Sequence, residues 1–228
     1  MQSRTRVQIY TMQSVAEAEA VAALGVDHVG VTPSHRGLPG EIDEATAADI
    51  CSTLAGRATS VALSVETDAD AVERMVAIVQ PDILHLCGPP GEMTPAAVAD
   101  LRRTLSGIRI MQAIAVTGPE AVETALSYQA AVDYLILDSV APDVPGVGAA
   151  GMVHDWTISA AIVVAVDVPV VLAGGLSPDN VAAAIETVLP WGVDSLTCTN
   201  RPLPGGGLEK DLDLVRRFVQ AVQGGAVS

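Results

Sequence analysis

The hydrophobic residues of this chain fall into short runs rich in valine, isoleucine and leucine, which alternate with alanine-rich stretches of helical length. The alternation continues from one end of the sequence to the other without a low-complexity linker. Strands that alternate with helices predict a mainly parallel sheet, because each parallel strand needs a crossover connection. About eight such units close a barrel, and 228 residues suit that fold. We therefore predict one α/β domain over residues 1–228, a (β/α)8 TIM barrel.

Residue type and spacing set the expected bounds of these elements. Strands are expected at 7–10, 28–32, 60–65, 83–86, 108–113, 134–137, 168–172 and 195–198. Helices are expected at 15–24, 44–54, 69–79, 96–105, 121–127, 156–166, 181–188 and 212–222. Helix beginnings carry capping signals: Ser14, Thr67 and Thr117 each precede an acidic residue by three positions, and Thr94 and Ser177 each precede a proline. Both arrangements suit the free N–H groups of a first helical turn.

Two connections are longer than the others. Residues 32–43 follow the second expected strand, and residues 138–155 follow the sixth. Loops after the strands of a TIM barrel lie at its catalytic face. The length of these two loops therefore points to contacts with a substrate, the alternative being a surface elaboration without function.

Charge and composition narrow the class of partner. Half of the residues are apolar, and 12 basic residues against 27 acidic ones leave a net charge of −15. This disfavours a nucleic acid or an anionic membrane surface as partner. No apolar run approaches the roughly 20 residues of a membrane span, and the sequence begins MQSR rather than with the apolar segment of a secretory signal. We expect a cytoplasmic protein, either a monomer or a homodimer.

Cysteine and histidine give no motif for a bound metal. The three cysteines lie far apart, which fits reduced thiols, and none has the spacing of a zinc site. No histidines pair at helical spacing. We expect no cofactor and no metal, although His35, His85, Asp138 and His154 would offer metal ligands if the fold brought them together.

Lysine occurs only once, as Lys210, just before the last expected helix. Aldolases that form a Schiff base need a lysine at the end of a barrel strand. The sequence has no lysine at such a position, which excludes the lysine-dependent aldolases.

Several residues at the ends of expected strands have side chains suited to catalysis. Asp138 ends the run YLILD at 134–138, where a carboxylate would face the catalytic end of the barrel; the alternative is a loop-ordering or capping role. His85 and Cys87 alternate with Ile83, so all three would line the barrel if that face points inward. Arg36 lies in the long second loop, where it would clamp a carboxylate or phosphate, or else be an ordinary surface arginine.

Loops with glycine or threonine follow the sixth, seventh and eighth expected strands. They contain Gly148, then Gly174 and Gly175, then Thr197 and Thr199. Loops in these places, beside a helix amino terminus, commonly bind phosphate because free amides and the helix dipole favour an anion. A small phosphorylated molecule is the expected ligand.

The sequence resembles the phosphoribosylanthranilate isomerase family, barrel enzymes of tryptophan biosynthesis, along nearly its whole length. The most specific stretch is VVLAGGLSPDNV at 170–181, and LILD at 135–138 and HDW at 154–156 support it. Weaker similarity is found in GVDHVGV at 25–31, SHR at 34–36, HLCG at 85–88 and GVD at 192–194. The resemblance implies an intramolecular isomerase of a phosphorylated sugar derivative.

The resemblance also implies roles for particular residues. The family catalyses an Amadori rearrangement, in which an acid protonates the furanose ring oxygen and a base removes the proton of the neighbouring sugar carbon. By motif, Asp138 corresponds to the acid and Arg36 to the arginine that holds the anthranilate carboxylate. The loops around Gly148, Gly174 and Gly175 correspond to the phosphate site.

Three family motifs are altered here. The first-strand pattern Lys-x-Cys-Gly, whose cysteine is the base, reads QIYT at 8–11, so Tyr10 replaces the cysteine. A tyrosine of ordinary pKa, near 10, stays protonated at neutral pH. The fourth-strand pattern Gln-Leu-His-Gly reads HLCG at 85–88, and TCTN at 197–200 replaces a serine-glycine-acid pattern.

Three hypotheses remain open from the sequence. The first keeps the family reaction, with Asp138 as acid and Tyr10, Cys87 or His85 as base. The second is an enzyme of different substrate or reaction that uses His85 and Asp138. The third is a barrel that binds a phosphorylated metabolite, or a partner, without turnover.

Overall fold

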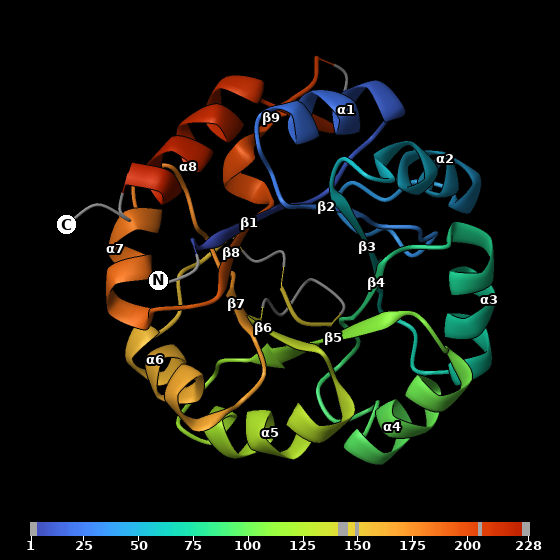
Figure 1. Cartoon of the computed structure of the whole chain (residues 1–228), viewed down its shortest axis with the longest axis vertical. Helices are drawn as coiled ribbons and strands as arrows, with labels where there is room; N and C mark the ends of the chain where they lie inside the picture. The colour runs from blue at the N-terminus through green and yellow to red at the C-terminus, as the bar shows by residue number, and fades with distance from the viewer. Residues whose placement is uncertain (1–3, 141–145, 149–150, 205–206, 225–228) are drawn as a thin grey trace.

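Parallel strands close into a barrel at the centre of the molecule, and helices surround it (Figure 1). The structure is a computed structural model that describes residues 4–140, 146–148, 151–204 and 207–224. Within these residues the closed barrel runs in chain order from β1 to β8, which confirms the predicted fold. The connection 138–155 and its glycine run are described only in part, and the first three residues lie outside the described ranges. None of the described helices is long and apolar enough to cross a membrane.

The elements have the following bounds. The barrel strands are β1 Arg6–Ile9, β2 His28–Val31, β3 Thr59–Ser64, β4 Ile83–Leu86, β5 Arg109–Ala115, β6 Tyr134–Asp138, β7 Val170–Leu172 and β8 Gly192–Ser195. The helices are α1 Val15–Ala23, α2 Glu44–Leu54, α3 Ala69–Val79, α4 Pro95–Thr104, α5 Ala121–Tyr128, α6 Trp156–Ala165, α7 Val181–Val188 and α8 Leu212–Gly224. Two 3-10 helices, η1 Gln129–Ala131 and η2 Thr197–Thr199, and a hairpin of β9 Asn200–Pro202 and β10 Leu208–Lys210 complete the chain.

The predicted eighth strand was wrong by three residues. It was expected at 195–198, whereas β8 is Gly192–Ser195 and the segment after it forms η2. Glycine and aspartate have low strand propensity, which hides this strand in the sequence. In the structure Gly192 lies against Arg6 of β1, where an added Cβ would come within 3.3 Å of the Arg6 backbone. The backbones of β1 and β8 pair along all four residues of β8.

Two of the expected helix caps are confirmed. Ser14 Oγ accepts the backbone N–H of Glu17 at 3.2 Å, and Thr94 Oγ1 accepts that of Ala97 at 3.2 Å. Ser177 instead belongs to a turn that precedes α7, and its carbonyl accepts the N–H of Val181. These bonds fix where three of the helices leave the catalytic face of the barrel.

The other two expected caps were wrong. Asp68, not Thr67, caps α3, with its Oδ1 accepting the Asp70 N–H at 3.2 Å. Thr117 donates its hydroxyl to the Glu120 carboxylate at 3.0 Å, and α5 begins only after Glu120, without a side-chain cap. A threonine three residues before an acidic residue therefore does not by itself identify a helix cap. At α3 the aspartate next to the helix accepts the free N–H instead.

The corrected cap of α3 gives a testable difference between two adjacent residues. Asp68→Ala is expected to lower the free energy of unfolding by about 1 kcal/mol, because it leaves an N–H of the first turn unpaired. Thr67→Ala should change it by less than about 0.5 kcal/mol. Urea denaturation of both variants measures the difference, and an equal loss in the two would contradict the assignment of Asp68.

The barrel separates two apolar regions. Between strands and helices lies the larger core, which includes Phe218 of α8. Inside the barrel a smaller cluster includes Val61, Ile83, Met111 and Ile136, one from each of four neighbouring strands. These side chains fill the barrel below its carboxyl-terminal end. The polar groups at that end therefore lie directly above a layer of apolar side chains.

Candidate active site

A pocket with a volume of about 50 Å³ lies at the carboxyl-terminal end of the barrel. Tyr10 after β1, His85 in β4, Cys87 after β4 and Asp138 at the end of β6 all line it. The structure therefore brings together the four residues predicted for catalysis. Asp194 of β8, which was not among the predicted site residues, lines the same pocket.

The Asp138 carboxyl is held in place by its own loop. Its Oδ1 accepts the backbone N–H of Ser139 at 2.7 Å and the Ser139 hydroxyl at 3.3 Å. Burial raises the pKa of Asp138 to about 7, and the bonds from Ser139 oppose this rise. Gly148 lies against the other oxygen: it has φ of +106°, and a Cβ there would be 2.6 Å from Oδ2. Only glycine fits beside this carboxyl, which stays partly protonated at neutral pH, as a general acid requires.

Tyr10 and His85 form a hydrogen-bonded pair within the barrel. Tyr10 Oη lies 3.1 Å from His85 Nδ1. The tyrosine ring lies over Gly30 of β2, where a Cβ would be 2.2 Å from a ring carbon, so the absence of a side chain there makes room for the ring. Burial, followed by the charge of Asp194, raises the pKa of Tyr10 well above its usual value, and burial lowers that of His85 to about 3. Both side chains are therefore neutral.

The Cys87 thiol is also held in its neutral form. It is buried and donates a hydrogen bond to the carbonyl of Val147. Burial first, and then the charge of Asp138, raise the pKa of Cys87 to about 12, against a smaller opposing effect of the Val147 backbone. A thiol of this kind is not a base at neutral pH.

Asp194 has a buried carboxyl group that forms no salt bridge with a described residue. Its side chain faces the barrel interior from a position paired with Gln8 of β1, and Oδ1 has no hydrogen-bond partner among the described residues. Burial and then the charge of Asp138 raise the pKa of Asp194 to about 8, whereas Gln8 and Lys210 lower it. The misplaced eighth strand concealed Asp194 in the sequence. Alternation from Gly192 through Asp194 to Leu196 would have shown which face it occupies.

A second, smaller pocket of about 20 Å³ adjoins the first at the loops predicted to bind phosphate. Gly174, Gly175 and Thr197 line it, and Asp138 and Asp194 line both pockets. The backbone N–H groups of Gly174, Gly175 and Thr197 donate to no other described residue. Such free amides are what an anion needs.

The remaining phosphate candidates lie differently. Gly148 faces Asp138 in the first pocket and does not line the second. Thr199 does not line either pocket: it is buried, and its hydroxyl donates to the carbonyl of Leu196 at 3.1 Å. Of the two threonines predicted to bind phosphate, Thr197 is thus the one that lines a pocket.

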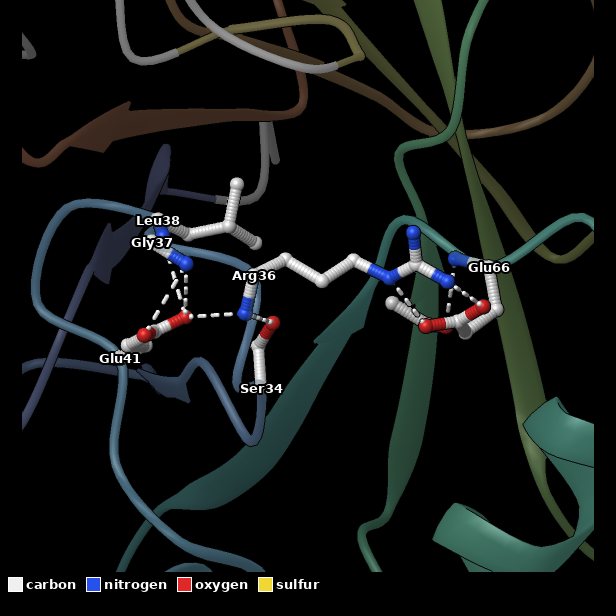
Figure 2. Close-up of polar contacts among 7 residues, drawn as sticks. Ser34, Arg36, Gly37, Leu38, Glu41 and Glu66 are labelled. Carbon is white, nitrogen blue, oxygen red and sulfur yellow. Dashed lines mark hydrogen bonds and ion pairs between the residues drawn. The ribbon is translucent and has the colours of Figure 1, made fainter.

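Arg36 lies outside both pockets and is engaged by an acidic residue (Figure 2). Its Nε and Nη2 each donate to the Glu66 carboxylate at 2.6 Å. The loop that carries Arg36 is ordered by Glu41, which accepts the backbone N–H groups of Arg36, Gly37 and Leu38 at 2.9 to 3.0 Å. The Arg36 guanidinium group is thus held by the Glu66 carboxylate, outside the two pockets.

The acidic and imidazole side chains that the structure describes do not gather into a metal site. Among the described residues, no three side chains of histidine, cysteine, aspartate or glutamate are arranged to hold a metal ion. His154, for example, lies at the glycine loop with its Nε2 2.8 Å from Ser159 Oγ. His28 lies at the opposite end of the barrel, with its ring edge-on to Tyr134 and tilted against Trp191.

Comparison with known proteins gives the family. The family model described as N-(5'phosphoribosyl)anthranilate (PRA) isomerase matches residues 8–221. This chain belongs to that family. The PRA isomerase of Haloarcula marismortui is 33% identical over 217 residues, which cover 95% of this chain and 95% of that protein.

Solved PRA isomerases share the barrel. The structure from Thermus thermophilus has a TM-score of 0.80 at 20% identity and covers 96% of this chain and 99% of its own. Another PRA isomerase, in complex with reduced 1-(o-carboxyphenylamino)-1-deoxyribulose 5-phosphate, has a TM-score of 0.76 at 24% identity over the same shares. The family model and the relative from Haloarcula marismortui confirm the resemblance drawn from the motifs, and these structures confirm the fold.

The lysine of this PRA isomerase family member occupies an unexpected position. Lys210 is 4% exposed, and its Nζ contacts the carbonyls of Tyr10 and Leu196 and the side chains of Thr199 and Asn200. Burial lowers the pKa of Lys210 to about 7, against the charges of Glu17 and Asp194. The sequence placed this lysine only near the last helix, because the hairpin of β9 and β10 that carries it inward was not predicted.

Proposed function

We propose that this chain catalyses the Amadori rearrangement of PRA, an aminoaldose phosphate, to the corresponding aminoketose phosphate. The observation that carries the proposal is the buried Asp138 carboxyl, raised in pKa and placed beside free amides of the loops after β7 and β8. An acid next to an anion site is what opening a phosphorylated furanose requires. Membership of the PRA isomerase family supports the choice of substrate.

The substrate would lie across the two adjoining pockets. Its phosphate would accept hydrogen bonds from the amides of Gly174, Gly175 and Thr197, and its ring oxygen would face Asp138. Ligand pockets usually measure about 300–1,000 Å³, much more than the space present here. Leu38 and Pro39 of the connection between β2 and α2 line the first pocket, so the substrate would displace them on entry.

The test is turnover by the purified chain. PRA, generated immediately before use, should be converted to a product that co-elutes with authentic aminoketose phosphate and shows a ketone carbon by NMR. The dephosphorylated aminoaldose should react much more slowly. Absence of conversion by the unaltered chain would contradict the proposal, and phosphate binding without conversion would favour a non-catalytic barrel.

The pairing of Arg36 with Glu66 makes a prediction about substrate affinity. A substrate carboxylate that binds Arg36 must compete with Glu66, so Glu66→Gln is expected to lower KM for PRA about 2- to 5-fold with little change in kcat. The estimate follows from the 0.2–1 kcal/mol typical of exposed ion pairs. Glu19→Gln, which frees the exposed Arg57 away from the site, is the matched control. An unchanged KM in Glu66→Gln would argue against contact between Arg36 and the substrate.

A further inference from the structure

The proposed reaction needs a group that accepts the proton of sugar C2. Burial keeps the pKa of Tyr10 well above its usual value and raises that of Cys87 to about 12, so both hold their protons. Burial lowers the pKa of His85 to about 3, which makes its imidazole a weak base. A good catalytic base has a pKa near the working pH, and none of these three side chains meets that condition.

Asp194 is placed where such a base is needed. Asp194 is, with Asp138, the second carboxyl that lines the first pocket. It also lines the second pocket, at the glycine loops. The side chain is 6% exposed and faces the interior of the barrel. Its Oδ1 has no partner among the described residues, so an oxygen lone pair is free to act on a ligand.

The two carboxyl groups come from strands on either side of β7. Asp138 ends β6 and Asp194 lies in β8, with β7 between them in the closed sheet. Two strand spacings amount to roughly 10 Å. After β7 the chain continues with Ala173, Gly174 and Gly175, so the strand between the two carboxyl groups contributes no large side chain there. A furanose held there by its phosphate would present opposite sides to Asp138 and Asp194.

We propose that Asp194 is the base that removes the proton of sugar C2 in this chain, which rests on the proposed function. Asp138 gives its proton to the ring oxygen as the C1–O bond breaks, and the nitrogen lone pair forms the C1=N bond. Asp194 takes the C2 proton; the C2–H electron pair forms C1=C2, and the C1=N pair returns to nitrogen. The C2 hydroxyl then gives its proton to Asp138 and C1 receives that of Asp194, which yields the ketone and restores both carboxyl groups.

The two carboxyl groups titrate as a coupled pair, in which Asp194, with a pKa of about 8, holds a proton more tightly than Asp138, with a pKa of about 7. Asp138 on β6 raises the pKa of Asp194 only while it is itself ionised, so one proton on Asp138 favours the anion on Asp194. Lys210 on β10 and the Gln8 amide on β1 also favour that anion. Tyr10 and Cys87, which face the same space, are neutral. The pair thus shares about one proton near neutral pH, and the reaction proceeds from the form in which Asp138 holds that proton and Asp194 is the anion.

The experiment compares Asp194→Asn, Asp194→Ala and Tyr10→Phe with the unaltered chain in PRA turnover. Loss of a general base predicts a fall in kcat of about 10²- to 10⁴-fold in both Asp194 variants. Added formate should restore part of the activity of Asp194→Ala in proportion to formate anion, because the deleted side chain leaves room for a small carboxylate. Tyr10→Phe should lose less than about 10-fold, since its hydroxyl only supports His85.

Controls separate a catalytic role from a structural one. Asp133→Asn, at the opposite end of the barrel, should keep full activity, and Asp194→Asn should bind inorganic phosphate within about 3-fold of the unaltered chain. Turnover by the unaltered chain with little loss in Asp194→Asn would overturn this inference alone. A collapse of Tyr10→Phe with no formate rescue of Asp194→Ala would assign the base to Tyr10. No turnover by the unaltered chain would overturn the proposed function as well.

Discussion

Replacement of Asp138 by asparagine is expected to lower kcat for PRA by about 10²- to 10⁴-fold while KM changes only a few-fold. Asparagine keeps the shape of the side chain beside Gly148 but has no acidic proton to give to the ring oxygen. The phosphate contacts proposed above are made by backbone amides of other loops, so ground-state binding should be largely retained. Steady-state kinetics on purified Asp138→Asn measures both constants.

The same carboxyl predicts a pH dependence of activity. Because burial raises the pKa of Asp138 to about 7, the acid form is lost as pH rises through that value, and kcat should fall on the alkaline side. The residual activity of Asp138→Asn should not show this fall at alkaline pH. A profile that is flat from pH 6 to 9 in the unaltered chain would contradict Asp138 as the acid.

The free energy of unfolding should also depend on pH through Asp138, and it should decrease as pH rises. A carboxyl with a pKa near 3.9 when unfolded and about 7 when folded binds its proton more tightly in the folded chain. Its contribution is fully present below the unfolded pKa and is lost as pH rises through 7, by up to about 4 kcal/mol. Asp194 acts in the same direction up to about pH 8. Asp138→Asn should therefore reduce the loss of stability between pH 4 and 8 in urea denaturation.

A matched control lies at the end of the same connection. Asp155→Asn alters the exposed cap of α6, whose Oδ1 accepts the Thr157 N–H at 2.9 Å, without touching either pocket. This variant should keep its kcat and its pH profile. Loss of activity in both variants by the same factor would mean that the loop as a whole, and not the acid, is responsible.

The fold was predictable because hydrophobic periodicity recurs in every unit. Helices α2, α3 and α7 and strand β4 begin and end where the sequence places them. Strand β8 was misplaced because Gly192 and Asp194 break the apolar run. Their positions are set by the neighbouring β1 and by the polar interior, neither of which is visible in a local window.

The site was only partly predictable for a related reason. Asp138 ends a strongly apolar strand, and His85 lies within one that Cys87 follows, so alternation alone places all three in the pocket. The ion pair of Arg36 with Glu66 joins residues thirty positions apart, and no spacing rule connects them. Lys210 reaches the barrel because it lies in the hairpin of β9 and β10, and the residues of this hairpin have no pattern that predicts strands. What the sequence does not convey is the electrostatics, because pKa values depend on burial that only the folded chain creates.

Gly175→Ala is expected to weaken binding of inorganic phosphate about 10- to 100-fold and to raise KM for PRA similarly. Gly175 has φ of +62°, and a Cβ there would be 2.9 Å from the carbonyl oxygen of Gly151. Asn180 anchors the same turn, with its Nδ2 donating to the Gly175 carbonyl at 3.0 Å. The loop must shift to admit a methyl group, and its amides would then no longer be placed for the proposed phosphate. Loss of hydrogen bonds to a charged group, at about 1.5–3 kcal/mol, gives the expected range.

Backbone strain alone must be separated from this loss, and the chain offers a suitable comparison. Gly25 has φ of +88° with nothing within 4 Å of an added Cβ, at the amino-terminal side of β2. Gly25→Ala should therefore lose about 1 kcal/mol of stability, as expected for a left-handed alanine, while its affinity for phosphate stays unchanged. Calorimetric titration with phosphate and urea denaturation on both variants distinguish the two effects. Equal affinity of Gly175→Ala and Gly25→Ala would place the anion elsewhere, since free amides at the loops after β7 and β8 are the reason for expecting it there.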